Sequence, residues 1–426
     1  MSARREIDVV ADWDGLACPT FMGTLSVTQV RGNEVFAFEY DTQWLASASR
    51  QQLDPSLLLY RGPQYPSGAR SNFGAFLDSS PDRWGRVLMR RREAQLAREQ
   101  GRDERKLLES DYLLGVHDGH RMGALRFRVG TRFLDDNDRL ASPPWTSLRA
   151  LERASLQLER QGAEDDPDYG RWLQMLIAPG GSLGGARPKA SVCDERGRLW
   201  IAKFPSRNDE YDTGAWEFVM HALATAAGLT VPEARIECYG HVREEGRGHR
   251  TFLSRRFDRL ATGARLHFSS AMTLLERQDG HDANDGASYL ELADLLMRLG
   301  SNTSRDLEQL WRRIVFFMCV SNTDDHLRNH GFMLKREGWA LAPAYDMNPD
   351  AFGEGLRLNV SETDNAQDLE LAKATASGFR IKKKRAEAIV TEVVHAVRGW
   401  RNVATRQGIS RAEQDRMKRA FRLADV

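Results

Sequence analysis

The chain has 426 residues, of which 41% are hydrophobic, and this composition supports a large core divided over two or three domains. Its 61 basic and 60 acidic residues leave a net charge of +1, so overall charge gives no indication of a nucleic-acid partner. The longest apolar run, Ile314 to Val320, is too short to cross a bilayer, and no apolar signal core follows the early arginines. We therefore expect a cytoplasmic protein that spans no membrane.

The four cysteines lie far apart in the sequence, at Cys18, Cys193, Cys238 and Cys319. None of them has the close Cys or Cys/His neighbour that is typical of zinc sites and disulfide frameworks. We expect reduced thiols that pack as small apolar groups, which fits a cytoplasmic enzyme.

The first 130 or so residues show a mixed pattern of strands and helices. Val35 to Tyr40 alternates apolar and polar side chains, and Met122 to Val129 also has the composition of a strand. Arg83 to Leu108 carries long charged side chains around a few apolar positions, which predicts a solvated amphipathic helix. The polar stretch from Asp135 to Pro144 predicts a connector.

A glycine-rich loop from Gly180 to Gly185 opens a second part of the chain. It leads into two strands that turn residues join, Lys189 to Cys193 and Leu199 to Phe204. Lys203 lies on the second strand among apolar neighbours, where a lysine needs a partner. A helix that Gly228 ends and two more strands follow, at residues 234–239 and 251–257.

The last third of the chain has a helical pattern. Ser288 to Glu291 forms a capping box that opens a helix closed by Gly300. The next helix has one strongly apolar face and runs directly into the polar segment Ser321 to Asn329. A short hairpin, the segment Pro343 to Asp346 and further helices complete the chain.

Three polar residues of this region have the spacing of a phosphate-transfer site. Asp324 and Asn329 are five residues apart, which matches the Asp and Asn of a kinase catalytic loop, and Asp346 follows 22 positions after Asp324. Hard oxygen ligands of this kind suit Mg²⁺. In isolation the same aspartates would be turn and cap residues, but their setting after a helix and around a hairpin favours a kinase site. His326 has no partner at metal-ligand spacing, so we interpret it as a hydrogen-bonded residue that orients the loop.

Further residues are candidates for binding ATP. Lys203 would contact the α- and β-phosphates, and Glu217, early on the following helix, is the candidate for its carboxylate partner. The loop residues Ser182, Leu183, Gly184 and Gly185 would approach the phosphates through backbone N–H groups. Their pattern is neither a Walker A motif nor the G-x-G-x-x-G of common kinases, so a surface loop is the alternative.

Together these residues resemble the HipA family of bacterial toxin kinases. The matching stretches extend over nearly the whole chain: Phe76 to Gly85, Ser182 to Lys189, Ala202 to Phe204, Arg256 to Arg259, Asn322 to Asn329 and Leu341 to Asp346. The resemblance implies an α+β, two-lobed protein-kinase-like fold with an extra N-terminal mixed α/β subdomain and an all-helical C-terminal lobe. The expected parts are residues 1–130, a kinase N-lobe over 131–259 and a helical C-lobe over 260–426.

The resemblance also implies the roles of single residues. Asp324 would be the catalytic base, Asn329 and Asp346 would bind Mg²⁺, and the hinge that faces adenine would include Phe257. Ser182 would be the serine that the enzyme phosphorylates on itself. A phosphoserine there would add nearly two negative charges to a loop that faces phosphate, so repulsion would expel the loop.

This chain departs from the family pattern at a few positions. Arg255 replaces an acidic residue beside the hinge, Arg187 and Pro188 replace a Gln-Glu pair in the loop, and Asp325 replaces a common Gly. No catalytic ligand is lost, so we expect these changes to affect loop mobility and substrate choice.

Members of the family act with a small HipB-like helix-turn-helix antitoxin that binds operator DNA. The resemblance therefore implies such a partner, a toxin serine/threonine kinase that arrests growth, and aminoacyl-tRNA synthetases as a substrate class. Residues 380–426 carry 13 basic against 5 acidic residues, a local +8 that is typical of a solvated helix face but could contact DNA phosphates. Two alternatives stay open, a small-molecule or lipid kinase and a non-catalytic co-repressor.

Overall fold

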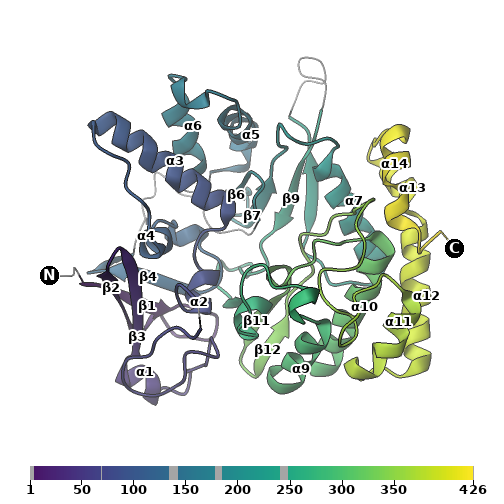
Figure 1. Ribbon diagram of the computed structural model, residues 1–426, viewed down its shortest axis with the longest axis horizontal. Helices are drawn as coiled ribbons and strands as arrows, with labels where there is room; N and C mark the ends of the chain where they lie inside the picture. Colours follow the sequence, from purple (N-terminus) through teal and green to yellow (C-terminus); the bar gives the residue numbers. More distant parts are fainter. Residues whose placement is uncertain (1–3, 69, 134–142, 178–184, 240–247, 426) are drawn as a thin grey trace. The chain divides into compact units, whose positions relative to one another are not determined.

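The computed structural model describes residues 4–68, 70–133, 143–177, 185–239 and 248–425 (Figure 1). The chain forms two compact units, one of Met1–Asn208 with Asp258–Ser269 and one of Asp209–Phe257 with Ser270–Val426. The boundaries of these two units differ from those of the three parts expected at residues 1–130, 131–259 and 260–426. The three parts describe functional segments, and they stay a prediction.

The first unit contains a five-stranded antiparallel sheet in the order β3-β2-β1-β4-β5. Its strands are β1 Arg4–Ala11, β2 Thr20–Val30, β3 Asn33–Tyr40, β4 Leu125–Val129 and β5 Arg132–Phe133. β2 and β3 are joined by Arg31 and Gly32, which both have positive φ, as a two-residue hairpin turn requires. The expected strands at 35–40 and 122–129 correspond to β3 and β4.

The first unit also contains helices of 5 to 18 residues. They are α1 Thr42–Ala46, α2 Gly74–Asp78, α3 Arg83–Gln100, α4 Glu109–Leu114, α5 Leu148–Leu158 and α6 Tyr169–Ile177, with the 3₁₀ turns η1 Asp118–His120, η3 Trp145–Ser147 and η4 Ala163–Asp165. Between the sheet and α2, the rings of Phe38, Phe73 and Phe127 each meet Phe76 edge to face, at centroid distances of 5.4, 5.6 and 5.7 Å. This aromatic cluster is the centre of the first unit's core.

Helix α3 is shorter than the pattern of charged residues predicts. The carboxylate of Asp82 caps its first turn by accepting from the Gly85 N–H at 2.7 Å. Gly101 adopts a left-handed conformation, with φ of 61°, directly after Gln100 and ends the helix. The remaining polar residues up to Leu108 therefore form a loop.

The first unit also contains the hairpin of β6 Lys189–Cys193 and β7 Leu199–Lys203, as expected. Trp200 and Ala202 are fully buried on one face of β7, whereas Lys203 lies on the other and is half-buried. The expected connector at 135–144 and most of the glycine-rich loop at 180–185 lie outside the described residues.

The second unit is mainly helical, with two short hairpins. Its helices are α7 Thr213–Ala226, α8 Ala271–Leu274, α9 Tyr289–Leu299, α10 Thr303–Val320, α11 Leu369–Thr375, α12 Lys383–Arg398, α13 Trp400–Arg406 and α14 Arg411–Met417, with the 3₁₀ turns η5 Ala283–Asp285, η6 Leu327–Asn329, η7 Ala376–Phe379 and η8 Lys418–Phe421. Antiparallel pairs are formed by β8 Ala234–Glu237 with β9 Thr251–Arg255, and by β11 Gly331–Lys335 with β12 Gly338–Leu341. β10, Phe268–Ser270, lies where the chain passes between the units.

Helix α10 is the centre of the second unit. Every residue from Leu310 to Val320 is buried, so this part of the helix is enclosed on all sides and not only on the apolar face that the sequence indicates. Arg312 and Arg313 are among the buried residues. α9, α11, α12 and β12 all pack against α10 (Figure 1).

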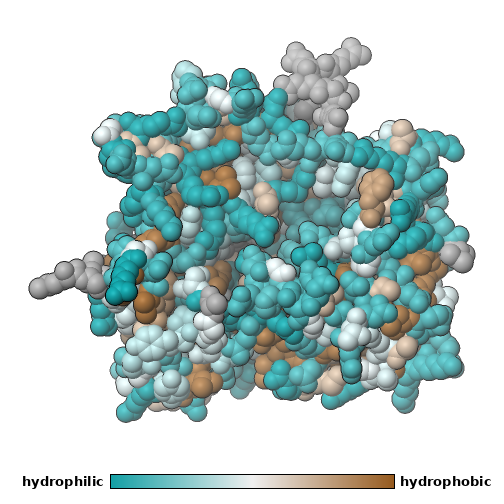
Figure 2. Space-filling view, viewed as in Figure 1, coloured by the Kyte–Doolittle hydropathy of each residue, from teal (hydrophilic) through white to brown (hydrophobic). Residues whose placement is uncertain are grey.

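The surface is mostly polar, in line with the 28% of charged residues. The face drawn in Figure 2 is largely hydrophilic, with apolar side chains in scattered small groups. Among the described residues, no helix combines the length and the apolar composition that a bilayer span requires.

Candidate active site

The loop that carries Asp324 begins at the C-terminal end of α10. Ser321 takes a left-handed conformation, with φ of 48°, and ends the helix. The N–H of Asn322 still reaches back to the Phe317 carbonyl at 3.0 Å, so the first loop residues stay bound to the helix. Because this end of α10 is buried on all sides, the loop starts from a fixed position.

Asp324 and Asn329 are held together within this loop. The Nδ2 of Asn329 donates to the backbone carbonyl oxygen of Asp324 at 3.0 Å. This bond occupies the amide nitrogen and leaves the amide oxygen of Asn329 as an acceptor or metal ligand. The backbone N–H of Asn329 donates to the His326 carbonyl at 2.8 Å, which closes the 3₁₀ turn η6.

Asp346 lies near Asp324 although the β11–β12 hairpin separates them in sequence. The pKa of the Asp324 carboxyl is raised above its usual value, first by loss of hydration and also by the Asp346 and Asp325 carboxylates, while His326 and Arg357 oppose the rise. A carboxyl with a raised pKa is a better proton acceptor. The structure thus brings together two carboxylates and one amide oxygen.

Asp346 has a backbone conformation that is unusual for its residue type. Its φ is 56°, in the left-handed region that few residues other than glycine adopt. Such strain persists where surrounding contacts determine the conformation, and it is concentrated at functional sites. The Tyr345 hydroxyl next to it donates to the Arg328 carbonyl at 2.6 Å, which links this segment to the loop of Asp324.

The segment after Asp346 is tied to the loop of Asp324 by three hydrogen bonds. Asn348 N donates to Asn322 Oδ1 at 3.2 Å, and Asp350 N donates to the Ser321 carbonyl at 3.0 Å. The Thr323 hydroxyl donates to Asp350 Oδ2 at 2.8 Å. The sequence analysis missed Asp350 and Asn348, because nothing in their spacing connects them with the loop.

The sequence predicts that His326 is a hydrogen-bonded residue that orients the loop, and the structure agrees for its backbone but not for its ring Nδ1. Its backbone carbonyl accepts from Asn329 N, and its N–H donates to the Asp324 carbonyl at 3.0 Å. Its ring Nδ1, in contrast, is buried and has no hydrogen-bond partner within the described part of the chain. The backbone of His326 therefore shapes the loop, and its side chain lies close enough to Asp324 to oppose the rise in the pKa of that carboxyl.

The candidate ATP-binding residues are divided between the two units. Lys203 and Gly185 belong to the first unit. Lys203 ends β7 opposite Lys189, whose ammonium forms a buried ion pair with Asp82 at 3.2 Å. Gly185 has φ of 79°, and its carbonyl accepts from Trp84 N at 3.3 Å. This bond connects the end of the glycine-rich loop to the start of α3.

Glu217 and Phe257 belong to the second unit. Glu217 lies in the second turn of α7 and is 5% exposed, so it is an acid in a largely apolar environment. The Phe257 ring lies 5.4 Å from the ring of Tyr345, the neighbour of Asp346. The remaining candidates, Ser182, Leu183 and Gly184, lie outside the described residues.

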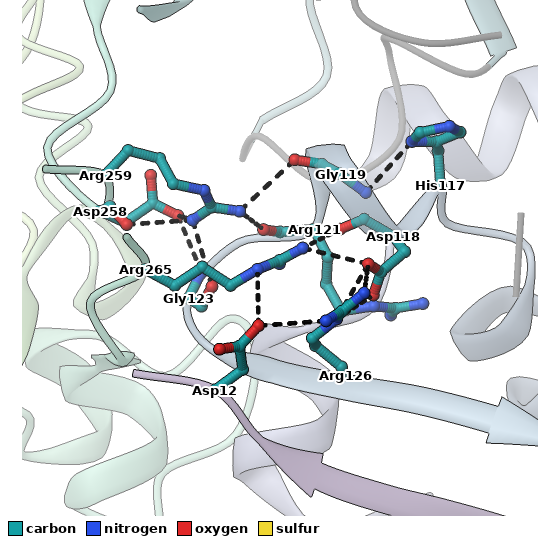
Figure 3. A network of polar contacts seen from close by, with 10 residues as sticks. All are labelled: Asp12, His117, Asp118, Gly119, Arg121, Gly123, Arg126, Asp258, Arg259 and Arg265. Carbon is teal, nitrogen blue, oxygen red and sulfur yellow. Dashed lines mark hydrogen bonds and ion pairs between the residues drawn. The ribbon is translucent and has the colours of Figure 1, made fainter. Parts of the chain in front are cut away.

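The family-like stretch Arg256 to Arg259 has a structural role in the first unit. Figure 3 shows that Asp258 and Arg259 clasp the backbone around η1, because Asp258 accepts from Gly123 N at 2.9 Å and Arg259 donates to the Arg121 carbonyl at 2.8 Å. A second group surrounds Asp118, which accepts from Arg126 at 2.7 Å and Arg265 at 3.1 Å. These contacts fix the segment that follows Phe257.

Some of the arginines in the basic C-terminal region form ion pairs. Arg385 binds Glu308 at 2.6 Å and Glu392 at 2.9 Å, and Arg401 binds Asp415 at 3.1 Å. This pairing is typical of the solvated helix face that the sequence indicates. DNA contact through this region stays a prediction.

The residues that could hold a metal ion are few. Among the described residues, no group of three or more His, Cys, Asp or Glu side chains has the arrangement of a metal site. Mg²⁺ at a kinase centre commonly uses one or two carboxylates together with phosphate oxygens and waters, so the Asn329 and Asp346 oxygens fit such a site. None of the four cysteines, all of which the structure describes, forms a disulfide; Cys319 is buried as a packed thiol would be, whereas Cys18 and Cys238 are exposed and do not fit that expectation.

A fixed loop with an Asp and an Asn, followed by a nearby Asp after a hairpin, has the order and spacing that are typical of kinase catalytic loops. Residues 181–400, just over half of the chain, match the HipA-like C-terminal domain, and the chain belongs to this family. Two proteins of Sinorhizobium fredii that are named as kinase candidates are similar to this chain. Y4dM is 28% identical over 54% of this chain and 56% of its own length. Y4mE is 26% identical over 46% of this chain and 48% of its own length. The chain thus spans about half the length of these curated relatives.

The fold is also that of a solved HipA. The structure of the Shewanella oneidensis toxin–antitoxin system HipA, with HipB and operator DNA, superposes with a TM-score of 0.66 over 95% of this chain and 93% of the other. The sequences are 16% identical, so this likeness shows the fold alone. The expected family and the expected α+β kinase-like fold are confirmed.

Proposed function

We propose that this protein is an ATP-dependent serine/threonine-protein kinase whose base is Asp324. The observation that carries the proposal is the bond from Asn329 Nδ2 to the Asp324 carbonyl, with Asp346 close enough to raise the Asp324 pKa. This arrangement supports the proposal, because phosphoryl transfer requires a proton acceptor near hard oxygen ligands for a metal ion. Lys203 would contact the ATP phosphates, with Glu217 as its partner.

In the proposed reaction, a serine hydroxyl gives its proton to the Asp324 carboxylate while its oxygen attacks the γ-phosphorus of ATP. The bond from this phosphorus to the bridging oxygen of the β-phosphate breaks, and ADP leaves. Mg²⁺ held by Asn329 and Asp346 would neutralise charge on the phosphates. The bonds from Asn348, Asp350 and Thr323 keep the two loops at a fixed distance.

The proposed substrates are proteins, including the enzyme's own Ser182. As a member of a toxin–antitoxin module it would arrest growth, bind a HipB-like antitoxin and contact operator DNA in that complex. Support comes from the fold it shares with a HipA whose structure contains HipB and operator DNA. Aminoacyl-tRNA synthetases are the proposed class of target.

The test uses purified protein, labelled ATP and Mg²⁺. We expect label on Ser182 of the wild type and none on Asp324→Ala. The matched control is Asp294→Ala, which removes an exposed aspartate of α9 whose carboxylate pairs with Arg298 Nε at 2.8 Å. Equal labelling of the wild type and Asp324→Ala would refute Asp324 as the base. Label found only on a metabolite in a cell lysate would favour a small-molecule kinase.

A further inference from the structure

Asp324 and Asp325 are neighbours in sequence with opposite environments. Asp324 faces solvent, whereas Asp325 is completely buried. The Oδ2 of Asp325 accepts from the Tyr289 hydroxyl at 2.6 Å and from His330 Nε2 at 2.8 Å. Its Oδ1 has no hydrogen-bond partner in the described part of the chain. A buried carboxylate needs strong hydrogen-bond donors, so these two bonds determine the position of the loop.

The donors to Asp325 are themselves buried and fixed. Tyr289 and His330 are both fully buried, and their rings meet edge to face at 5.7 Å. Burial and the Asp325 carboxylate raise the pKa of the Tyr289 hydroxyl well above its usual value, so it stays protonated and donates. Tyr289 is the first residue of α9, where the capping box at Ser288 fixes its backbone.

Arg313 of α10 connects this group to the segment that leads to Asp346. Its Nη2 donates to the Ala342 carbonyl at 2.8 Å, and its Nη1 lies 3.4 Å from His330 Nδ1. Because a guanidinium only donates, His330 Nδ1 must accept, so its Nε2 carries the proton that it donates to Asp325. Asp325 and Arg313 are then the two opposite charges of a buried network.

The network contacts both segments of the candidate active site, namely the loop that carries Asp324 and Asn329 and the segment that leads to Asp346. Asp325 directly follows Asp324, His330 directly follows Asn329, and Ala342 lies four residues before Asp346. Ala342 N also donates to the Gly331 carbonyl at 2.8 Å, directly after His330. One buried guanidinium therefore ties the loop of the base and the segment of Asp346 to the central helix.

We propose that Asp325, Tyr289, His330 and Arg313 are positioning residues that hold Asp324 at its working distance from Asn329 and Asp346. This proposal rests on the kinase function proposed above and adds a specific role for a position where the family commonly has Gly. A glycine at 325 would leave the Tyr289 hydroxyl and His330 without their acceptor.

The test is the removal of one hydroxyl. Tyr289→Phe keeps the ring and removes the 2.6 Å bond to Asp325. Its matched control is Tyr40→Phe, which removes another buried tyrosine hydroxyl, the donor to the Leu57 carbonyl in the first unit. With self-labelling from ATP as the assay, we expect kcat of Tyr289→Phe to fall roughly tenfold to a hundredfold while KM for ATP changes less than about twofold, since a displacement of about 1 Å costs up to a hundredfold in rate.

A second variant separates positioning from loss of stability. Asp325→Asn keeps the shape and one oxygen acceptor but removes the charge, and we expect the same fall in kcat with little change in KM. If Tyr289 acts through Asp325, the double variant should be no slower than the slower single variant. All variants are assayed well below their unfolding temperatures.

Two outcomes would overturn the proposal. In the first, Tyr289→Phe and Asp325→Asn have the same kcat as Tyr40→Phe. In the second, both variants fail to fold although Tyr40→Phe folds, because the network would then contribute to stability alone. Either outcome leaves the proposed function intact as long as Asp324→Ala is inactive. Labelling of Asp324→Ala would instead refute the kinase assignment of Asp324.

Discussion

Gly353 offers a direct way to disturb the spacing of the two loops at the candidate active site. A Cβ at this position would lie 2.4 Å from Thr323 Oγ1 and 2.6 Å from Asp350 Oδ2. Ordinary contact begins at 3.4 Å, so Gly353→Ala requires a displacement of about 1.0 Å, the difference between 3.4 and 2.4 Å. The displaced pair is the 2.8 Å bond between Thr323 and Asp350, next to Asp324.

The expected effect is larger on rate than on stability. Overpacking costs about 1–3 kcal/mol in a rigid core and less in a loop that can shift. A shift of about 1 Å beside the base, in contrast, lowers the rate by up to about a hundredfold. We therefore expect Gly353→Ala to lose between about tenfold and a hundredfold in kcat of self-labelling, with a free energy of unfolding lower by about 1 kcal/mol.

The matched control is Gly399→Ala, between α12 and α13. Its Cβ would meet only the Ala396 carbonyl at 3.6 Å, an ordinary contact, so this variant should keep full activity. Labelling kinetics and urea denaturation of both variants give the comparison. A Gly353→Ala enzyme as fast as Gly399→Ala would show that the bond between the two loops does not determine the position of Asp324.

Three further predictions concern stability and activity. Asp82→Ala removes the carboxylate that pairs with the buried Lys189 ammonium, so the free energy of unfolding should fall by about 3–5 kcal/mol in urea denaturation, and an unchanged midpoint would contradict the buried pair. Burial lowers the pKa of His267 to about 3, whereas the unfolded chain has a value near 6.5, so the free energy of unfolding decreases as the pH falls below about 6.5. At pH 5, His267→Leu should abolish about 2 kcal/mol of this decrease. Plots of unfolding free energy against pH that run parallel for the wild type and the variant would refute this prediction. Expression without an antitoxin should arrest growth, and Asp346→Asn should relieve the arrest; continued arrest by this variant would count against a metal role for Asp346.

Local sequence patterns predicted most of the elements around the site. The hairpin of β6 and β7, the capping box of α9 and the helix before the loop follow from alternation, turn residues and apolar spacing, all of which act over a few residues. The Asp324 and Asn329 pair was visible for the same reason, since both belong to one loop. Their catalytic and metal-binding roles stay predictions.

The parts that the sequence could not show depend on tertiary contacts. Arg313 has the pattern of a solvated helix residue, and only the packing of α9 and β12 against α10 encloses it. Asp325 was interpreted only as a departure from a common Gly, because its partners Tyr289 and His330 come from other elements. Helix α3 ended earlier than its charge pattern indicated because one glycine adopts a left-handed conformation.

The burial of α10 has a consequence for how the second unit unfolds. The helix contacts the chain around Asp346 at three levels: Asp306 accepts from Leu341 N at 2.9 Å near its start, Arg313 binds the Ala342 carbonyl in its middle, and Ser321 accepts from Asp350 N just past its end. Local opening around such an element is rare, since it requires the release of the unit's whole core. Amides of α10 should therefore exchange with deuterium only through global unfolding, and heat inactivation should coincide with melting of the second unit.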